Sequence, residues 1–131
     1  MDEVDERIIE ILKRDGRIPF VDVAKKLNLT EGAIRARVKK LVHDKVILKF
    51  TVDLENSTRA IVSVGTSQSI PTEKVSEAIR ALGIEHVYEV SGNYDIVCFV
   101  QAKNTTKLND IIEKIRSLKG VIDTSTSMVL K

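Results

Sequence analysis

The chain has 131 residues, of which 43% are hydrophobic and 31% are charged, and its formal net charge is +2. This composition is typical of a globular protein of one ordinary domain or two small ones, and it excludes a disordered chain. The longest apolar run, Ile96 to Val100, is too short to span a membrane, and no secretory signal is visible, so we expect a cytoplasmic protein.

Residue types that carry catalysis or bind metals are scarce. The single cysteine, Cys98, cannot form an internal disulfide, and the apolar run around it predicts a small buried side chain. Neither His43 nor His86 has a cysteine or carboxylate at metal-ligand spacing. The sequence therefore predicts no cofactor, no metal site and no catalytic triad, which makes an enzyme the least favoured class.

The positive charge is concentrated in the first part of the chain. Residues 1–50 hold 12 Lys and Arg against 9 Asp and Glu, a net charge of +3, whereas residues 51–131 hold 9 against 10, a net charge of −1. Between residues 35 and 49, six basic residues accompany one acidic residue, Asp44. A local basic patch of this kind suits a polyanionic partner.

Two helices are predicted before residue 30. Residues 2–14 carry apolar side chains at helical spacing, with carboxylates near the start, where the helix dipole favours negative charge. Asp15-Gly16 should end this helix, with Gly16 in the left-handed conformation. Pro19 can begin a short second helix, because its missing amide would be unpaired there in any case.

A third helix should begin at Thr30, whose hydroxyl can accept a hydrogen bond from an amide of the first turn. Its apolar stripe consists of Ile34, Val38, Leu41 and Val42. The opposite face carries Gly32, Ala33, Ala36, Lys39 and Lys40, with Arg35 and Arg37 on its flanks. Small residues allow a helix to lie close to a groove floor, while basic side chains reach base edges and phosphates. Taken alone, this face is equally compatible with a solvated helix whose charges only confer solubility.

The short second helix, the tight turn at Asn28-Leu29 and the basic third helix form the helix-turn-helix pattern, whose second member enters the major groove. After this head, residues 46–54 alternate loosely and are rich in β-branched residues, which predicts a strand. We expect a DNA-binding domain over residues 1–50, a connecting strand and linker over 51–58 with its joint at 55–58 around Asn56, and a second domain over 59–131.

The second domain is predicted to have the order β-α-β-β-α-β. Strands are expected at 59–68, 85–90, 94–101 and 121–130, with the third strand central in the sheet. Helices should start at Pro71-Thr72 and before Leu108, and Gly83 and Gly120 should end them. This order closes as a ferredoxin-like sheet with both helices on one face, so the fold class is α+β. The uncovered face predicts a homodimer.

Three segments together resemble the Lrp/AsnC (feast/famine) family of transcription regulators. They are VDERIIEILKRDGRI at 4–18, AIRARVKKL at 33–41 and VSGNYD at 90–95, and the resemblance extends over nearly the whole chain. It implies a winged helix-turn-helix head before a ferredoxin-like βαββαβ domain, and the expected source is archaeal. It also implies a dimer that holds two recognition helices over a palindromic site, with dimers assembling further, often into an octamer.

The resemblance implies a small effector, commonly an amino acid, bound where the turn after residue 90 meets the final strand. The implied effector residues are Gly92, Asn93, Tyr94, Asp95, Thr124, Ser125 and Thr126. Exposed amides can receive a carboxylate, a side-chain carboxylate can receive an α-ammonium, and hydroxyls can orient a polar side chain. From the residues alone, the alternative is a hairpin turn and ordinary strand hydroxyls.

Two of the positions that depart from the family pattern bear on the effector pocket and on the segment after the third helix. Asn93 stands where an acidic residue is common, which makes the implied pocket less negative. Lys45 stands where glycine usually follows the recognition helix, which leaves the direction of the next segment open.

The favoured function is a sequence-specific, effector-responsive regulator. The residues expected at DNA are Thr30, Arg35, Ala36, Arg37, Lys39, Lys40 and Lys49. Arg37 lies close to the apolar stripe, so a structural ion pair is its alternative role. Two other functions remain: an effector-sensing module that acts through protein partners, and an architectural protein that coats DNA with little sequence preference.

Overall fold

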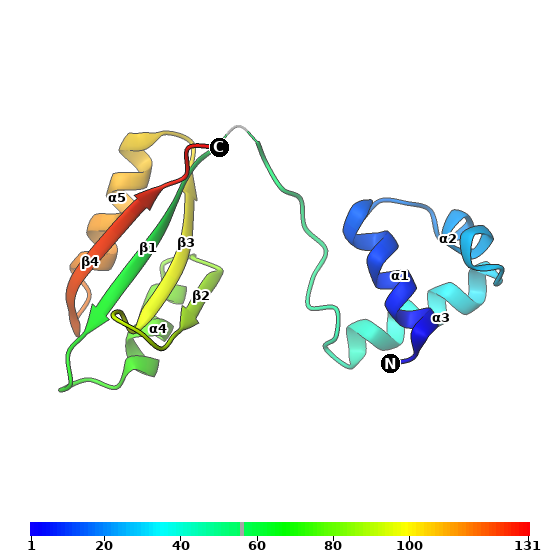
Figure 1. The fold of residues 1–131 in the computed structure, drawn as a ribbon, viewed down its shortest axis with the longest axis horizontal. Helices are drawn as coiled ribbons and strands as arrows, with labels where there is room; N and C mark the ends of the chain where they lie inside the picture. Colours follow the sequence, from blue (N-terminus) through cyan, green and yellow to red (C-terminus); the bar gives the residue numbers. More distant parts are fainter. Residues whose placement is uncertain (56) are drawn as a thin grey trace. The chain divides into compact units, whose positions relative to one another are not determined.

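The computed structural model describes residues 1–55 and 57–131, and its contacts group Met1–Asp53 into one unit and Leu54–Lys131 into a second (Figure 1). The predicted joint includes Asn56, which lies outside the described residues. No helix in the part of the chain that is described is long and apolar enough to cross a membrane.

The first unit is built from three helices, α1 (Glu3–Arg14), α2 (Phe20–Leu27) and α3 (Glu31–His43). Ile8, Val23, Ile34 and Val38 are at most 5% exposed and form the centre of its core. Asn28 takes a left-handed conformation (φ 57°) at the end of α2, which produces the predicted tight turn before α3. The helix-turn-helix prediction is therefore confirmed.

The prediction for Gly16 was wrong. Helix α1 ends at Arg14 as expected, but Gly16 is not among the residues with positive φ. Asp15 ends the helix in an extended conformation (φ −144°), and its amide donates to Ile11 O. Its carboxylate then accepts the Arg17 amide at 3.0 Å, so the turn needs no left-handed residue.

The prediction of a strand over residues 46–54 was also wrong, because the described residues of the first unit form no strand. β-branched residues favour a strand only where a neighbouring strand completes the hydrogen bonds, and the described residues of the first unit supply none. Its alternate side chains are exposed instead, with Leu48 at 80% and Val52 at 72%.

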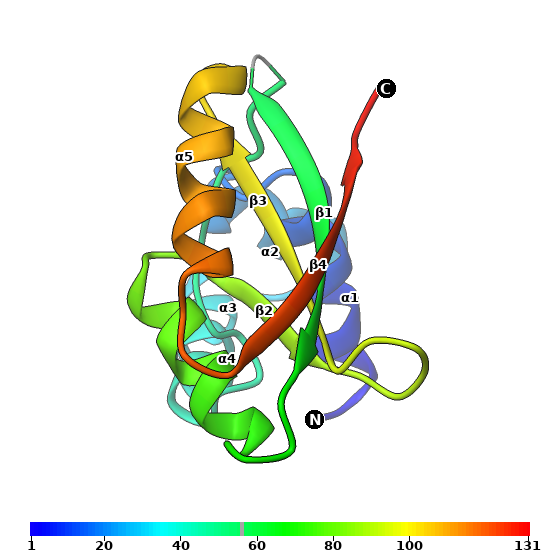
Figure 2. The same cartoon turned by 90° about the vertical axis from the view of Figure 1, so that its left-hand side faces the viewer.

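The second unit has the predicted order of elements. They are β1 (Thr58–Thr66), α4 (Thr72–Ala81), β2 (His86–Glu89), β3 (Ile96–Ala102), α5 (Thr105–Arg116) and β4 (Val121–Met128). The sheet is antiparallel with the order β2-β3-β1-β4, so β3 is interior as predicted. Gly83 has positive φ directly after the C-cap of α4, as predicted. The prediction that Gly120 ends α5 was wrong, because α5 already ends at Arg116 with Ser117 as its C-cap, and Gly120, also with positive φ, lies in the turn before β4. Both helices lie on one side of the sheet (Figure 2).

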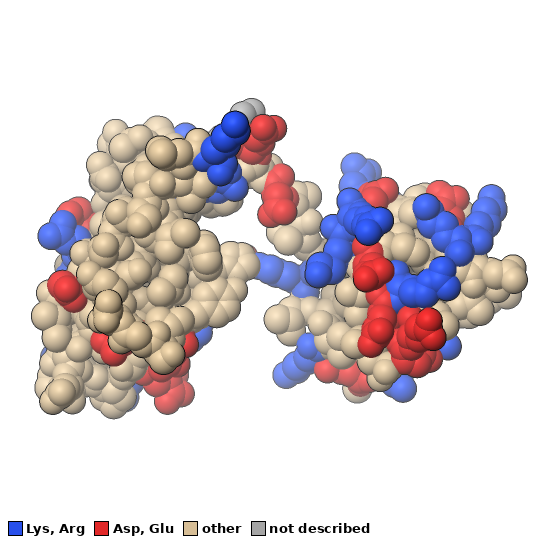
Figure 3. Space-filling model, viewed as in Figure 1, with Lys and Arg blue, Asp and Glu red and all other residues tan. Residues whose placement is uncertain are grey.

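The two faces of the sheet differ in burial. Val62, Val64, Ile96 and Cys98 are fully buried beneath α4 and α5. Burial raises the pKa of the Cys98 thiol to about 11, and its Sγ lies 3.6 Å from Val62 O, consistent with a packing role. The other face has no covering element in the part of the chain described, and it presents an almost uncharged surface in Figure 3.

Candidate nucleic-acid interface and effector site

Thr30 fixes the start of α3. It has an extended conformation (φ −84°, ψ 154°), and its Oγ1 accepts a hydrogen bond from the Ala33 amide at 3.2 Å. This is the predicted N-cap, which satisfies an amide that would otherwise lack a partner in the helix. The hydroxyl accepts this one bond, and its own O–H can still donate to another group.

The two faces of α3 separate as the apolar stripe predicts, with one exception. Ile34, Val38 and Leu41 are at most 5% exposed, whereas Val42 is 43% exposed and was wrongly predicted to be buried. Val42 lies in the last turn of α3, and it is not among the described residues that pack against the core of the first unit. The exposed residues of the helix include Gly32, Arg35, Ala36, Lys39 and Lys40. They form a strip with small residues towards the N-terminus and lysines towards the C-terminus.

Arg35 is held by two neighbours. Its Nη2 donates to Glu31 Oε1 at 2.7 Å, one turn earlier on α3. Its Cζ lies 5.3 Å from the centroid of the Phe20 ring, at the start of α2. The side chain remains 63% exposed, so these contacts orient the guanidinium without covering it.

Arg37 is paired within the protein. Its Nη1 donates to Asp2 Oδ2 at 2.7 Å and to Asp5 Oδ1 at 3.0 Å, at the start of α1. The Arg37 hydrogen bond lowers the pKa of Asp2 to about 2, and the Asp5 amide contributes in the same direction. These carboxylates in turn raise the pKa of Arg37. The geometry matches the structural alternative for this residue.

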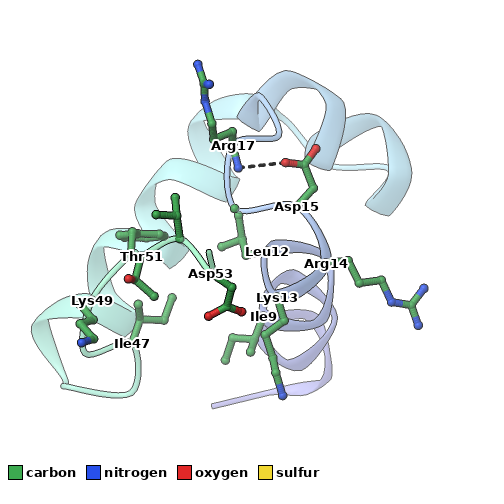
Figure 4. Close-up of a pocket in the computed structure, with 13 residues that line it drawn as sticks. Ile9, Leu12, Lys13, Arg14, Asp15, Arg17, Ile47, Lys49, Thr51 and Asp53 are labelled. Carbon is green, nitrogen blue, oxygen red and sulfur yellow. Dashed lines mark hydrogen bonds between the residues drawn. The ribbon is translucent and has the colours of Figure 1, made fainter. Parts of the chain in front are cut away.

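The segment after α3 carries Lys45 and Lys49. Lys45 has φ 58°, so it occupies the left-handed region in which a glycine is preferred. The chain then passes α1 and forms one side of a pocket of about 590 Å³. Figure 4 shows Ile9 and Leu12 of α1 on one side, with Ile47 and Lys49 from the later segment on the other. Lys49 is exposed and lines this pocket.

The implied effector turn is organised by Asp95. The ladder between β1 and β3 stops at Val64 and Ile96, and Asp95 extends it. Its amide donates to Val64 O at 3.0 Å, and its Oδ2 accepts the Thr66 amide at 2.8 Å. Gly92 has φ 125°, and both Gly92 and Asn93 are exposed, whereas Tyr94 is half-buried.

The hydroxyl residues of β4 do not share one face. Thr124 and Thr126 pair with Val64 and Val62, so they lie on the face covered by the helices, whereas Ser125 pairs with Ser63 on the open face. Adjacent strand residues point to opposite sides of a sheet. The structure thus brings Ser125 to the open face and separates it from the two threonines.

Three features of these sites were missed from the sequence. A Cβ at Gly65 would collide with Oδ1 of Asp123, so this glycine allows the Asp123 carboxylate to lie across β1. The register also shifts between Gly65 and Thr66, which sequence periodicity does not reveal. The contact between Phe20 and Arg35 joins two helices and likewise had no local signal. Among residues 1–55 and 57–131, no cluster of metal-binding side chains is found.

Comparisons with known proteins match both units. Residues 1–42 match the model of the AsnC-type helix-turn-helix domain, and residues 59–131 match the model of the Lrp/AsnC ligand-binding domain. The chain is 44% identical over 134 residues to the HTH-type transcriptional regulator LysM of Sulfurisphaera tokodaii, covering 100% of this chain and 96% of that protein. It is 34% identical over 136 residues to the HTH-type transcriptional regulator FL11 of Pyrococcus furiosus, covering 100% and 90%.

Solved structures share the fold at lower sequence identity. The crystal structure of PH0061 superimposes with a TM-score of 0.87 at 23% identity, covering 100% of this chain and 93% of that one. A feast or famine regulatory protein from M. tuberculosis complexed with L-methionine superimposes with a TM-score of 0.84 at 22% identity, covering 99% and 92%.

Proposed function

We propose that this chain, which belongs to the Lrp/AsnC family and is a transcription regulator, reads specific duplex sites with α3 and changes its binding when a free amino acid is bound. The observation that carries the DNA step is the exposed strip on α3, small near its capped start and basic beyond it, in a helix-turn-helix head. As a DNA-binding regulator it works in the cytoplasm, where the DNA is.

The proposed DNA contacts follow the geometry of α3. Thr30, Arg35 and Ala36 lie towards the N-terminal end of the helix, the part that meets base edges in helix-turn-helix proteins. Lys39 and Lys40 follow on the same exposed strip and suit phosphates. Lys49 is exposed on the following segment and is proposed as a flanking phosphate contact.

Arg37 has a different proposed role. Two carboxylates already accept from its Nη1, and a cation that stays so paired contributes little to a phosphate contact. We assign it to the support of α3 against α1 rather than to the DNA surface.

The proposed effector site is the end of the sheet around Gly65, at the turn over residues 92–95. The exposed backbone of Gly92 and Asn93 suits a carboxylate, while the carboxylates of Asp95 and Asp123 lie beside β1 and suit an α-ammonium. The M. tuberculosis structure with L-methionine supports an amino acid as the class of effector. Of the three predicted hydroxyl residues of β4, only Ser125 lies on the open face, so we propose it as the one whose hydroxyl contacts the effector from that face.

We propose a homodimer built through the open face of the sheet, with further assembly up to an octamer. Phe99 is 47% exposed there and Tyr88 is 49% exposed, with their rings in edge contact at 6.1 Å. Residues 46–54 add a second row of exposed apolar side chains. Apolar surface of this extent in a soluble protein favours burial against another copy.

The test is equilibrium binding of the purified chain to fragments of its own upstream DNA, with unrelated duplex as competitor, with and without a panel of amino acids. We expect saturable binding to one fragment that resists competition and that one amino acid alters. Equal binding to every fragment would instead support an architectural protein, and no binding would support a module that acts through protein partners. Sedimentation of the same sample measures the assembly state.

A further inference from the structure

Arg35 is the one residue of the exposed strip on α3 for which the described contacts fix the side chain from two directions. Glu31 holds one edge of the guanidinium through a 2.7 Å ion pair, and the Phe20 ring lies 5.3 Å from its carbon. Phe20 belongs to α2 and is half-buried against the core of the first unit, so its position is set by packing. The guanidinium is thereby tied to both helices of the helix-turn-helix.

Such restraint matters for recognition. A long exposed arginine loses side-chain entropy when a ligand orders it, and an arginine that is already ordered loses less. The ion pair engages one N–H of Nη2, and a guanidinium has several others for a planar, two-point contact. The restraint therefore orients Arg35 without consuming its capacity to bind.

The surroundings of Arg35 favour a base over a phosphate as its target. It lies in the second turn of α3 beside Ala36, with Gly32 one turn earlier, and all three are exposed. Side chains this small let the helix approach the floor of the groove. There, guanine is the base that offers two neighbouring acceptors, N7 and O6, to one guanidinium.

Building on the DNA binding proposed above, we infer that Phe20 and Glu31 are positioning residues that hold Arg35 for a two-point contact with a guanine. Glu31 has a second effect, because its carboxylate repels phosphates and disfavours duplexes that give Arg35 no guanine. Sequence preference then depends on two residues that themselves touch no base.

The test begins with duplexes selected from a random library by the full-length chain. At each guanine required by the selected site, 7-deazaguanine is substituted, which removes the N7 acceptor and keeps base pairing. Arg35→Ala and the base change are then combined in a double-mutant cycle. At one guanine per half-site, each single change should weaken binding roughly 5- to 100-fold, and the combination should add little.

The positioning role is tested in the same cycle with Phe20→Leu and Glu31→Gln. Each should reduce the penalty of the 7-deaza substitution by about 2- to 5-fold, while Glu31→Gln should leave binding to unrelated duplex equal or stronger. Glu31→Asp keeps the charge at the helix start but shortens the side chain, so it should reduce the guanine penalty as Glu31→Gln does. Glu10→Gln, an exposed change on α1, removes one negative charge elsewhere and should leave that penalty unchanged.

The outcomes separate this inference from the function on which it rests. If no sequence is enriched from the library, sequence-specific binding fails and the inference fails with it. If a site is enriched but no guanine couples to Arg35, the inference is overturned and the regulator function stands. The same holds if Phe20→Leu and Glu31→Gln both leave the coupling at its wild-type value. Because Glu31 is exposed, its variants should fold, and they test the inference even if Phe20→Leu unfolds the first unit.

Discussion

Nη1 of Arg37 on α3 lies 2.7 Å from Oδ2 of Asp2, which precedes it by 35 residues in the sequence. Asp2 is also the N-cap of α1, where its side chain accepts the Asp5 amide and the Asp5 side chain accepts the Asp2 amide. The guanidinium therefore bridges the capping box of α1 and the recognition helix. If Arg37 supports α3 against α1 and does not contact DNA, its replacement should change the stability of the chain and not its binding to phosphates.

Replacement of Arg37 by Gln should lower the unfolding midpoint of the chain without changing the number of phosphates it binds. The slope of log affinity against log salt should stay at its wild-type value, because removing one phosphate interaction would reduce it by about 0.9. Anisotropy titrations at several salt concentrations measure that slope. A slope reduced by about one unit per protomer would show that Arg37 contacts a phosphate and would contradict its assignment to a supporting role.

Acid should weaken the same bridge in a defined range. The pKa of Asp2 is lowered from 3.8 to about 2 in the folded protein, so its stabilising contribution is fully present above pH 4 and is lost as the pH falls through 2. Asp2→Asn should remove that part of the pH dependence. Denaturant midpoints followed by helical circular dichroism between pH 5 and 2 provide the comparison, and parallel curves for the two proteins would contradict it.

Lys45→Gly should stabilise the chain by about 1 kcal/mol, because a left-handed residue with a Cβ costs about that much. Asn28→Gly is the matched control, since Asn28 has nearly the same φ of 57° but asparagine tolerates this conformation better. Its gain should be smaller. A loss of stability in Lys45→Gly would mean that the lysine side chain makes a contribution larger than the strain.

Asp95 should show separable structural and binding roles. Asp95→Ala leaves the Thr66 amide without its acceptor and should cost about 1–2 kcal/mol. Asp95→Asn retains an oxygen acceptor and should fold normally, but its neutral side chain should weaken the response to an amino acid. Denaturation together with DNA titrations in the amino-acid panel distinguishes the two, and a full response in Asp95→Asn would exclude the proposed ammonium contact.

Local signals in the sequence predicted most of the fold. The cap at Thr30, the end of α4 at Gly83, and the apolar spacing of the helices each depend on a few neighbouring residues. Features that depend on distant partners were not accessible. The strand expected at 46–54 needs a neighbouring strand, and the partners of Arg37 lie more than thirty residues away.

The candidate sites show the same division. The order of small and basic residues on α3 follows from helical periodicity and was predicted, but the ring of Phe20 against Arg35 depends on how α2 packs on α3. In the second unit, the turn at 92–95 was identified from its motif. The register that sends Ser125 and Thr124 to opposite faces was not, because it is fixed only by pairing with β1.

The measurement that tests DNA binding by α3 most directly is the salt dependence of binding to a selected site, for wild type and for Lys39→Ala with Lys40→Ala. If a dimer makes about 6–10 phosphate contacts, wild-type affinity should fall roughly 10³- to 10⁵-fold between 50 and 200 mM salt. The double variant should have a slope shallower by about 0.9 for each phosphate that it no longer neutralises, with unchanged stability. An unchanged slope in the variant, or a wild-type affinity indifferent to salt, would contradict the assignment of α3 to DNA.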